Sequence, residues 1–271
     1  RFLLDRTHDT ELARLLRPNN KIALQQWMWG RQAMDVIAEF GVKAEAHEWM
    51  TILKRLQPRL YSISSSPKTD AGEVQLTVSA VRYDHEGLSR TGVCSTFLAD
   101  HCEDTEIPIF VQKSVHFRPP SASDTPMIMV GPGTGIAPFR GFLNERKELG
   151  HTGKNWLFFG EQHEETDFYY RDEMEAMRDD GFLTHLDVAF SRDQRQKIYV
   201  QDRIREHGAR VWSWLEAGAH FYVCGDASRM AKDVDATLRE VVRTHGRLDE
   251  EDTELFMKQL HADKRYVRDV Y

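Results

Sequence analysis

A glycine-rich segment with the spacing of a phosphate-binding loop begins where an apolar run ends. Residues 127–130 are all apolar, Gly131, Gly133 and Gly135 alternate directly after them, and Pro138 follows. Glycine lets the backbone approach an anion closely, and the unpaired N–H groups of a helix's first turn attract phosphate. Proline suits that first turn, where no N–H donor is needed. The segment predicts a nucleotide phosphate site, although a tight turn without a ligand would have the same pattern.

A cluster of cations follows a second apolar run. Ser191 and Arg192 come directly after residues 183–190, and Arg195 and Lys197 lie within the next five positions. Arginine donates two parallel hydrogen bonds to phosphate, lysine adds a point charge, and a nearby tyrosine ring could stack on a base. These residue types suit the 2′-phosphate of NADP, because NAD sites favour an acid at the ribose. A solvated basic loop explains the same residues equally well.

Composition and charge exclude several functional classes. The 271 residues suit two domains, and the net charge of −7 argues against a general nucleic-acid binder. The three cysteines share no metal-ligand spacing, and such a sparse set suits a reducing cytoplasm. We find neither a signal peptide nor an apolar run long enough to cross a bilayer, so we expect a cytoplasmic protein with no membrane partner. Because the chain starts at Arg1 in a polar segment, we expect further residues ahead of it.

The first part of the chain, up to about residue 58, has apolar residues at helical spacing. We expect its tryptophans, Trp27, Trp29 and Trp49, in the core rather than at a ligand. From residue 59 the period changes to two, with alternating runs near 74–78 and 107–111, which is typical of an antiparallel barrel or sandwich.

Two motifs in the alternating region could bind a flavin nucleotide. Arg59, Tyr61 and Ser62 place a cation beside an aromatic ring and a hydroxyl. The turn at residues 92–96 could cap a helix near Phe97 and present its N–H groups to a phosphate. Each motif alone is weak, because a strand arginine and a glycine turn are common.

Beyond a proline-rich linker at 117–126, apolar strand patterns alternate with helical patterns. The strand candidates are residues 127–130, 155–159, 183–190 and 220–224, and helical patterns follow from Phe139, Phe168, Val200 and Arg229. Continuous apolar strands between helices indicate a parallel sheet covered on both faces, with ligands at the carboxyl ends of its strands. Cys224 would lie at such an end, or be an inert buried thiol, and Asp226 is a candidate helix cap.

Together these motifs resemble the ferredoxin–NADP reductase superfamily and, within it, the diflavin branch. The resemblance rests on residues 59–62, 92–95, 131–138, 191–201 and 223–234, which follow the order expected of that superfamily. Within the branch, residues 155–160, 191–194 and 268–271 are most similar to the NADPH–sulfite reductase flavoproteins.

The resemblance implies a β-barrel plus α/β fold. A helical connecting region would span residues 1–58, a FAD-binding antiparallel barrel without its early strands residues 59–120, and a parallel five-stranded doubly wound NADP-binding domain residues 121–271. The implied activity is hydride transfer from NADPH to FAD. Electrons would then pass through a flavodoxin-like FMN domain, expected ahead of this chain, to a sulfite reductase haemoprotein.

The resemblance also assigns site residues by position. FAD would be held by Arg59, Leu60, Tyr61, Ser62, Thr77, Val78, Ser79, Tyr83, Gly92, Val93, Cys94, Ser95 and Tyr271, the last as a lid over the flavin ring. NADPH would be held by Gly133, Thr134, Ser191, Arg192, Lys197, Ile198, Tyr199, Val200, Gln201 and Asp233. Ser62, Cys224 and Asp269 match the hydride-transfer trio. A reductase serving another acceptor and a non-enzymatic nucleotide-binding module remain alternatives.

Overall fold

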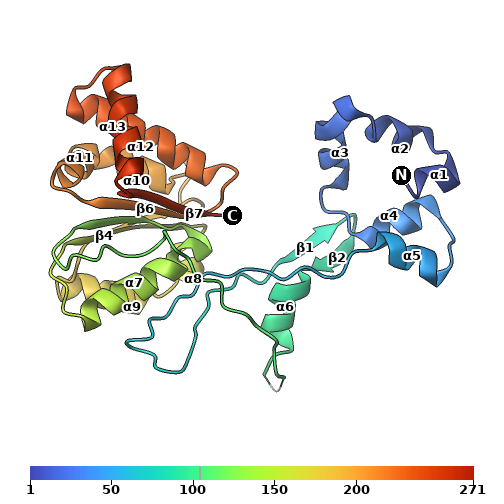
Figure 1. Ribbon diagram of the computed structural model, residues 1–271, viewed down its shortest axis with the longest axis horizontal. Helices are drawn as coiled ribbons and strands as arrows, with labels where there is room; N and C mark the ends of the chain where they lie inside the picture. The colour runs from blue at the N-terminus through green and yellow to red at the C-terminus, as the bar shows by residue number, and fades with distance from the viewer. Residues whose placement is uncertain (104) are drawn as a thin grey trace. The chain divides into compact units, whose positions relative to one another are not determined.

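A computed structural model describes residues 1–103 and 105–271. The chain divides into two compact units (Figure 1): Arg1–Leu60 with Ala80–Ile107 form the first, and Tyr61–Ser79 with Pro108–Tyr271 form the second. The segment Tyr61–Ser79 therefore packs with residues far along the chain. The domain boundaries near residues 58 and 120 stay a prediction.

The second unit is built on a five-stranded parallel sheet. Its strands, in the spatial order β5-β4-β3-β6-β7, are β5 Leu183–Phe190, β4 Asn155–Glu161, β3 Met127–Val130, β6 His220–Gly225 and β7 Tyr266–Val270. The four strand candidates from the sequence are confirmed to within two residues at their carboxyl ends, and β7 supplies the fifth strand. The central strands β4, β3 and β6 are mostly apolar because both faces of the sheet are buried there, whereas the edge strands β5 and β7 include charged residues such as Asp187 and Arg268.

Helices cover both faces of this sheet (Figure 1). One face carries η2 Gly133–Ile136, α7 Ala137–Glu148, α8 Glu164–Asp167 and α9 Arg171–Asp179, and the other α10 Val200–Glu206, α11 Gly208–Glu216, α12 Met230–Gly246 and α13 Glu250–Ala262. Side chains of β3 alternate between the two cores: Met127 and Met129 pack toward α7, whereas Ile128 and Val130 pack toward α12. All four are fully buried, which makes β3 the centre of the unit.

The expected linker is not solvated where it begins. Phe117 is 8% exposed, and its ring centroid lies 5.5 to 5.8 Å from those of Phe139, Phe142 and Tyr222. An aromatic side chain of this size stabilises a core when it is buried, so it anchors the start of the segment.

The first unit is mostly helical, with one hairpin. Its elements are α1 Leu4–Thr7, α2 Thr10–Leu15, η1 Pro18–Asn20, α3 Lys21–Met28, α4 Ala33–Phe40, α5 Ala46–Ile52, β1 Arg82–His85, β2 Leu88–Thr91 and α6 Val93–Asp100. The hairpin turns at Glu86 and Gly87, both with positive φ (53° and 77°), which is the backbone that a two-residue hairpin turn requires. The predicted helix near Phe97 forms and begins at Val93.

A closed barrel is not seen. Among the described residues, antiparallel pairing is limited to β1 with β2 and to a single bridge between Ile63 and Leu76. The alternating runs at 74–78 and 107–111 form no strands, and Ile109 and Val111 are exposed. A strand is stable only when its backbone is paired with neighbours, and alternation alone supplies no partner.

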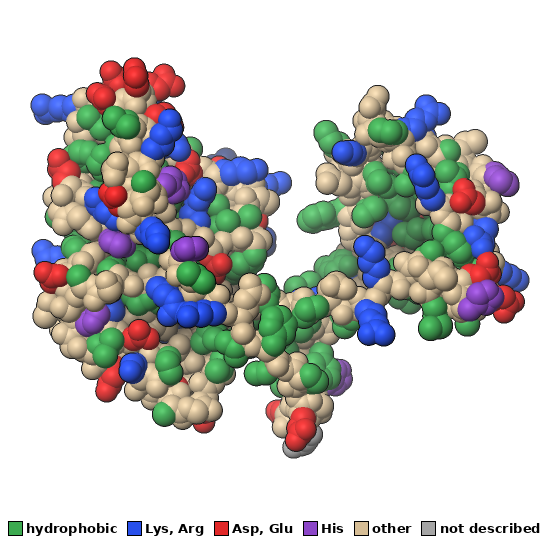
Figure 2. Space-filling view, in the orientation of Figure 1, with side chains coloured by type: hydrophobic (Ala, Val, Ile, Leu, Met, Phe, Trp, Pro, Cys, Tyr) green, Lys and Arg blue, Asp and Glu red, His purple; other side chains and the backbone are tan. Residues whose placement is uncertain are grey.

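The tryptophan prediction is only partly right. Trp27 and Trp49 are half-buried, with ring centroids 6.1 Å from Phe40 and 5.2 Å from Phe2 respectively. Trp29 is 84% exposed, so its assignment to the core is wrong. It follows the end of α3, where the chain leaves the helix, and hydrophobic side chains are visible across this face of the first unit (Figure 2).

Candidate nucleotide and redox site at the carboxyl edge of the sheet

The glycine loop after β3 packs directly on the end of β6. A Cβ on Gly135 would lie 2.2 Å from the carbonyl oxygen of Cys224, and one on Gly131 would lie 2.6 Å from the carbonyl oxygen of Gly135. Close packing therefore requires these two glycines whether or not a ligand binds. Gly133 is different, because its φ of +58° is a conformation that glycine adopts most readily. The loop leads through η2 into α7, whose first turn contains Pro138 as expected.

Ser62, Cys224 and Asp269, predicted as a trio, lie together at this edge. Cys224 and Asp269 are register neighbours on β6 and β7, and the Ser62 hydroxyl donates to Asp269 Oδ2 over 3.2 Å. Burial raises the pKa of the Cys224 thiol to about 12, the Asp269 carboxylate adds to the effect, and a hydrogen bond with Ser62 opposes it. The thiol is thus protonated at neutral pH and acts as a neutral group here.

The C-terminal residue is anchored beside this trio. The Tyr271 N–H donates to Gly225 O (3.1 Å), and its carbonyl accepts from the N–H of Ala227 (3.0 Å). Its hydroxyl forms a 2.9 Å hydrogen bond with Thr134 Oγ1 of the glycine loop. The ring is 63% exposed, so it lies against the loop with one side open.

The predicted cations after β5 form no close ion pair with any described residue, although the charge of Arg192 acts on the Glu161 carboxyl. In the described part of the chain, Arg192, Arg195 and Lys197 are exposed and form no ion pair within 4.0 Å. The acid among them, Asp193, accepts instead from His163 Nδ1 and the Glu164 N–H, each over 2.8 Å. Asp193 therefore does not neutralise these cations, and both the 2′-phosphate site and the solvated basic loop agree with their exposure.

The remaining predicted nucleotide residues differ in what they can contact. Tyr199 precedes α10 and is 43% exposed, whereas Val200 is 3% exposed and packs against Gly160. Only the backbone of Val200 could reach a ligand. Ile198 and Gln201 are half-buried, and Asp233 is exposed in the first turn of α12.

Asp226 binds the backbone that leads into α12, but Arg229 and not Asp226 occupies the N-cap position, so the predicted N-cap is wrong. The Asp226 carboxylate accepts from the N–H groups of Ser228, Arg229 and Met230 at 3.1, 2.8 and 3.1 Å. These hydrogen bonds, together with one from the Ser228 hydroxyl, hold the pKa of Asp226 far below its usual range. The helix itself begins one residue later than predicted, at Met230.

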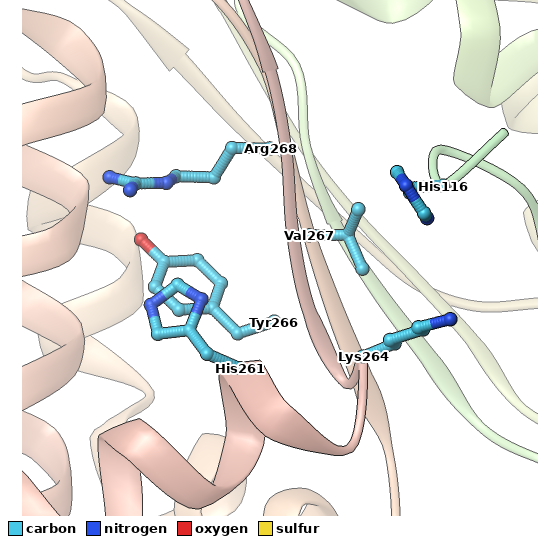
Figure 3. Close-up of a pocket in the computed structure, with 6 residues that line it drawn as sticks. All are labelled: His116, His261, Lys264, Tyr266, Val267 and Arg268. Carbon is cyan, nitrogen blue, oxygen red and sulfur yellow. The ribbon is translucent and has the colours of Figure 1, made fainter. Parts of the chain in front are cut away.

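A separate cavity of about 260 Å³ lies at the start of β7 (Figure 3). It is lined by His116, His261, Lys264, Tyr266, Val267 and Arg268, none of which belongs to the predicted site. Among the described residues, no group of three or more His, Cys, Asp or Glu side chains has a metal-binding arrangement, and no helix is both long and apolar enough to span a membrane.

Two family descriptions match this chain. "FAD binding domain" matches residues 2–97, and "Oxidoreductase NAD-binding domain" matches residues 129–236. The chain is 49% identical over 265 residues to the NADPH sulfite reductase flavoprotein alpha-component of Mannheimia succiniciproducens, covering 97% of this chain and 44% of the relative. Its counterpart in Bacillus subtilis is 45% identical over 267 residues, covering 98% and 44%.

The chain is homologous to the sulfite reductase flavoproteins. The predicted resemblance is thereby confirmed, as is the prediction of one FAD-binding and one nicotinamide-nucleotide-binding part. The chain spans less than half the length of the curated relatives that it matches.

The predicted FAD residues of this flavoprotein homologue are divided between the two units. Arg59, Leu60, Tyr83 and the turn Gly92, Val93, Cys94 and Ser95 belong to the first unit, whereas Tyr61, Ser62, Thr77, Val78, Ser79 and Tyr271 belong to the second. Arg59 donates to Gln57 O, and the Tyr83 hydroxyl donates to Gly30 O over 3.2 Å. Within the first unit, Ser95 Oγ accepts from the N–H of Val81 over 3.0 Å, which fixes the start of α6.

Sequence reasoning missed Arg140, which attaches the segment containing Ser62 to the second unit. Its guanidinium donates to Ser64 O (3.0 Å), Gln75 Oε1 (2.6 Å) and Glu173 Oε2 (2.7 Å). An arginine on a helix after a glycine loop carries no sequence signal for such a role, because its partners lie far away in the sequence. It is a positioning residue for the serine of the trio.

Sequence reasoning also missed Glu161, the last residue of β4. It comes at a strand's carboxyl end, where ligand-binding side chains are expected, so a signal was present. An acid beside a predicted phosphate loop runs against simple charge complementarity, and the sequence gives no reason to select it.

Proposed function

We propose that this chain is the NADPH-oxidising, FAD-binding part of a sulfite reductase flavoprotein. The observation that carries the proposal is the gathering of Ser62, Cys224 and Asp269 at the carboxyl edge of the sheet, next to Tyr271 and the glycine loop. In a doubly wound sheet this edge is where nucleotides bind. The homology to sulfite reductase flavoproteins supports the same assignment.

The residues present fit the two nucleotides. Exposed cations that form no ion pair within 4.0 Å in the described chain suit a 2′-phosphate, and the glycine loop presents a helix start to a pyrophosphate. When bound, NADPH supplies a hydride and FAD accepts it and releases electrons singly. The protein's part is to position the two rings and to stabilise charge.

Each member of the trio has a role that its chemistry allows. Ser62 can offer its hydroxyl to a ring nitrogen of the flavin, and Asp269 can stabilise the positive charge that develops on a nicotinamide. Cys224, held protonated by burial, adds bulk and a weak donor without adding charge. Tyr271 would lie over the flavin ring and would have to move for a nicotinamide to reach it.

The wider assignments are part of the same proposal. We assign residues 1–58 to a connecting region, 59–120 to a FAD-binding barrel that includes the β1–β2 hairpin, and 121–271 to the NADP-binding domain. Electrons would leave through an FMN-binding flavodoxin-like domain to a sulfite reductase haemoprotein in the cytoplasm. The names of the relatives, which give NADPH and sulfite reductase, support the electron donor and the final enzyme of this route.

The test compares NADPH with NADH as electron donors to the chain reconstituted with FAD, using ferricyanide as acceptor. Replacing both Arg192 and Lys197 by alanine removes two charge-assisted contacts, so kcat/KM for NADPH should fall by about 100-fold or more while that for NADH changes by less than about threefold. Arg178→Ala removes an exposed arginine that pairs with Asp179 and serves as the matched control. Equal losses with both donors would refute the 2′-phosphate site, and no reduction of FAD by either donor would refute the function.

A further inference from the structure

The Glu161 carboxyl faces the glycine loop. Glu161 ends β4, which pairs directly with β3, so its side chain emerges at the same edge of the sheet as the loop. Glu161 Oε1 lies 3.5 Å from the position that a Cβ on Gly133 would occupy, and it is the nearest atom to that position. A group that binds against Gly133 therefore meets this carboxyl.

Charged and polar groups from three neighbouring segments act on this carboxyl. Asp167 at the end of α8 repels its negative charge, Arg192 after β5 attracts it, and the Gln162 N–H donates a hydrogen bond to it. Tyr169 is also coupled to it, because the Glu161 charge helps to raise the pKa of the Tyr169 phenol. Burial is the strongest influence and raises the pKa of Glu161.

We propose that Glu161 controls the affinity of the glycine loop for phosphate, and that a dinucleotide binds there with this carboxyl protonated. The inference rests on the proposed function, because it takes the loop to be the pyrophosphate site. A pyrophosphate against Gly133 would bring negative charge next to a half-buried carboxylate, which disfavours the ionised form of the carboxyl. Once protonated, Glu161 loses that repulsion and gains an O–H donor for a phosphate oxygen.

The proposal predicts that binding takes up a proton. Between the pKa of Glu161 in the free chain and its higher pKa in the complex, binding takes up a fraction of a proton, so affinity falls as the pH rises through that window and is constant above it. Glu161→Gln cannot ionise and keeps a donor, so it should bind about tenfold more tightly at pH 8, the effect of about one pKa unit of coupling. The affinities for NAD⁺ and for NADP⁺ should increase by the same factor in this variant, because the pyrophosphate is common to both.

The experiment is calorimetric titration of the FAD-reconstituted chain with NAD⁺ and with NADP⁺, from about pH 5 to about pH 8. NAD⁺ is the decisive probe, because its pyrophosphate does not titrate in this range whereas the 2′-phosphate of NADP⁺ does. Titration in two buffers of different ionisation enthalpy gives the number of protons taken up. Glu164→Gln, on α8 and paired with Arg171, is the matched control.

Proton uptake by the native chain that disappears in Glu161→Gln, with tighter binding at high pH, supports the proposal. Tight binding with no proton uptake in the native chain, or a pH dependence that Glu161→Gln leaves unchanged, overturns it while the proposed function stands. Failure of the native chain to bind either nucleotide at any pH overturns the proposed function, and this inference with it. The number of protons taken up is measured on the native chain. The proposal can therefore still be overturned if the Glu161→Gln variant does not fold.

Discussion

The two compact units of this chain bury their hydrophobic side chains to very different extents. In the second unit every residue of β3 is fully buried between two cores. In the first unit, only Leu12 and Leu15 among the described hydrophobic residues are buried, while Met28 and Trp29 are more than half exposed. The second unit is therefore fixed by its own packing, whereas the first depends on a few contacts.

The contacts that remain in the first unit are largely polar. Arg90 pairs with Asp35, and Arg31 pairs with Glu39 and lies over the ring of Trp27. The Arg90 and Asp35 side chains are only 11% and 17% exposed, but a pair with an exposed partner such as Glu39 contributes little, and a two-stranded hairpin is marginal by itself. A dense core specifies one structure in a way that scattered pairs do not, so perturbations of the second unit should have the larger effects.

The largest effect should come from the glycine loop of the second unit. Gly135→Ala places a Cβ 2.2 Å from the Cys224 carbonyl oxygen, and both sides of the contact are backbone that cannot move freely. We expect a loss of about 3 kcal/mol in the free energy of unfolding, measured by chemical denaturation. Gly181→Ala is the control: its φ is +82° with open space around it, so it should cost only about 1 kcal/mol of backbone strain. Equal losses of unfolding free energy in the two variants would contradict the close contact between Gly135 and the end of β6.

The second-largest effect is expected from Arg140→Ala, which tests whether the segment Tyr61–Ser79 belongs to the well-packed second unit. Arg140→Ala removes the contacts to Ser64, Gln75 and Glu173, at a cost of about 2 kcal/mol. Hydrogen exchange of the amides in Tyr61–Ser79 should accelerate, while exchange in β3 should not.

An unchanged exchange rate in this segment would show that other contacts hold it. The Thr77 Oγ1 hydrogen bond with the Tyr170 hydroxyl, 2.7 Å long, is the alternative anchor. Arg178→Ala, which removes an exposed arginine from α9 beyond the reach of this segment, should leave exchange there unchanged.

The same contrast explains how much of the fold could be predicted. Strands β3, β4 and β6 are mostly apolar and bounded by turns, and burial on both faces produces that pattern directly. The runs at 74–78 and 107–111 alternate as strands do, but alternation says only which side chains share a face. It does not say which strand is the partner, and without a partner the backbone cannot complete its hydrogen bonds.

For the site, the sequence predicted proximity where strand ends position the residues, and the roles of these residues stay a prediction. Cys224 and Asp269 meet because the ends of β6 and β7 are neighbours in the sheet. Ser62 reaches them through the contacts of Arg140, which link positions 65 and 76 residues apart in the sequence. Glu161 shows the other difficulty, since the direction of a single side chain at a strand end depends on packing that no local pattern reveals.

The smallest effect should come from the exposed aromatic surface of the first unit. Trp29→Ala removes a side chain that is 84% exposed, so the free energy of unfolding should change by less than about 0.5 kcal/mol. Leu15→Ala, at 2% exposed, should cost about 2 kcal/mol or more in the same unit, because it removes buried apolar area and leaves a cavity. Both are measured by circular dichroism during denaturation, which follows the helices of the first unit. A large loss of unfolding free energy from Trp29→Ala would mean that this ring is buried in solution against something outside the first unit. The two units would then differ in what covers their hydrophobic side chains and not in how densely each is packed.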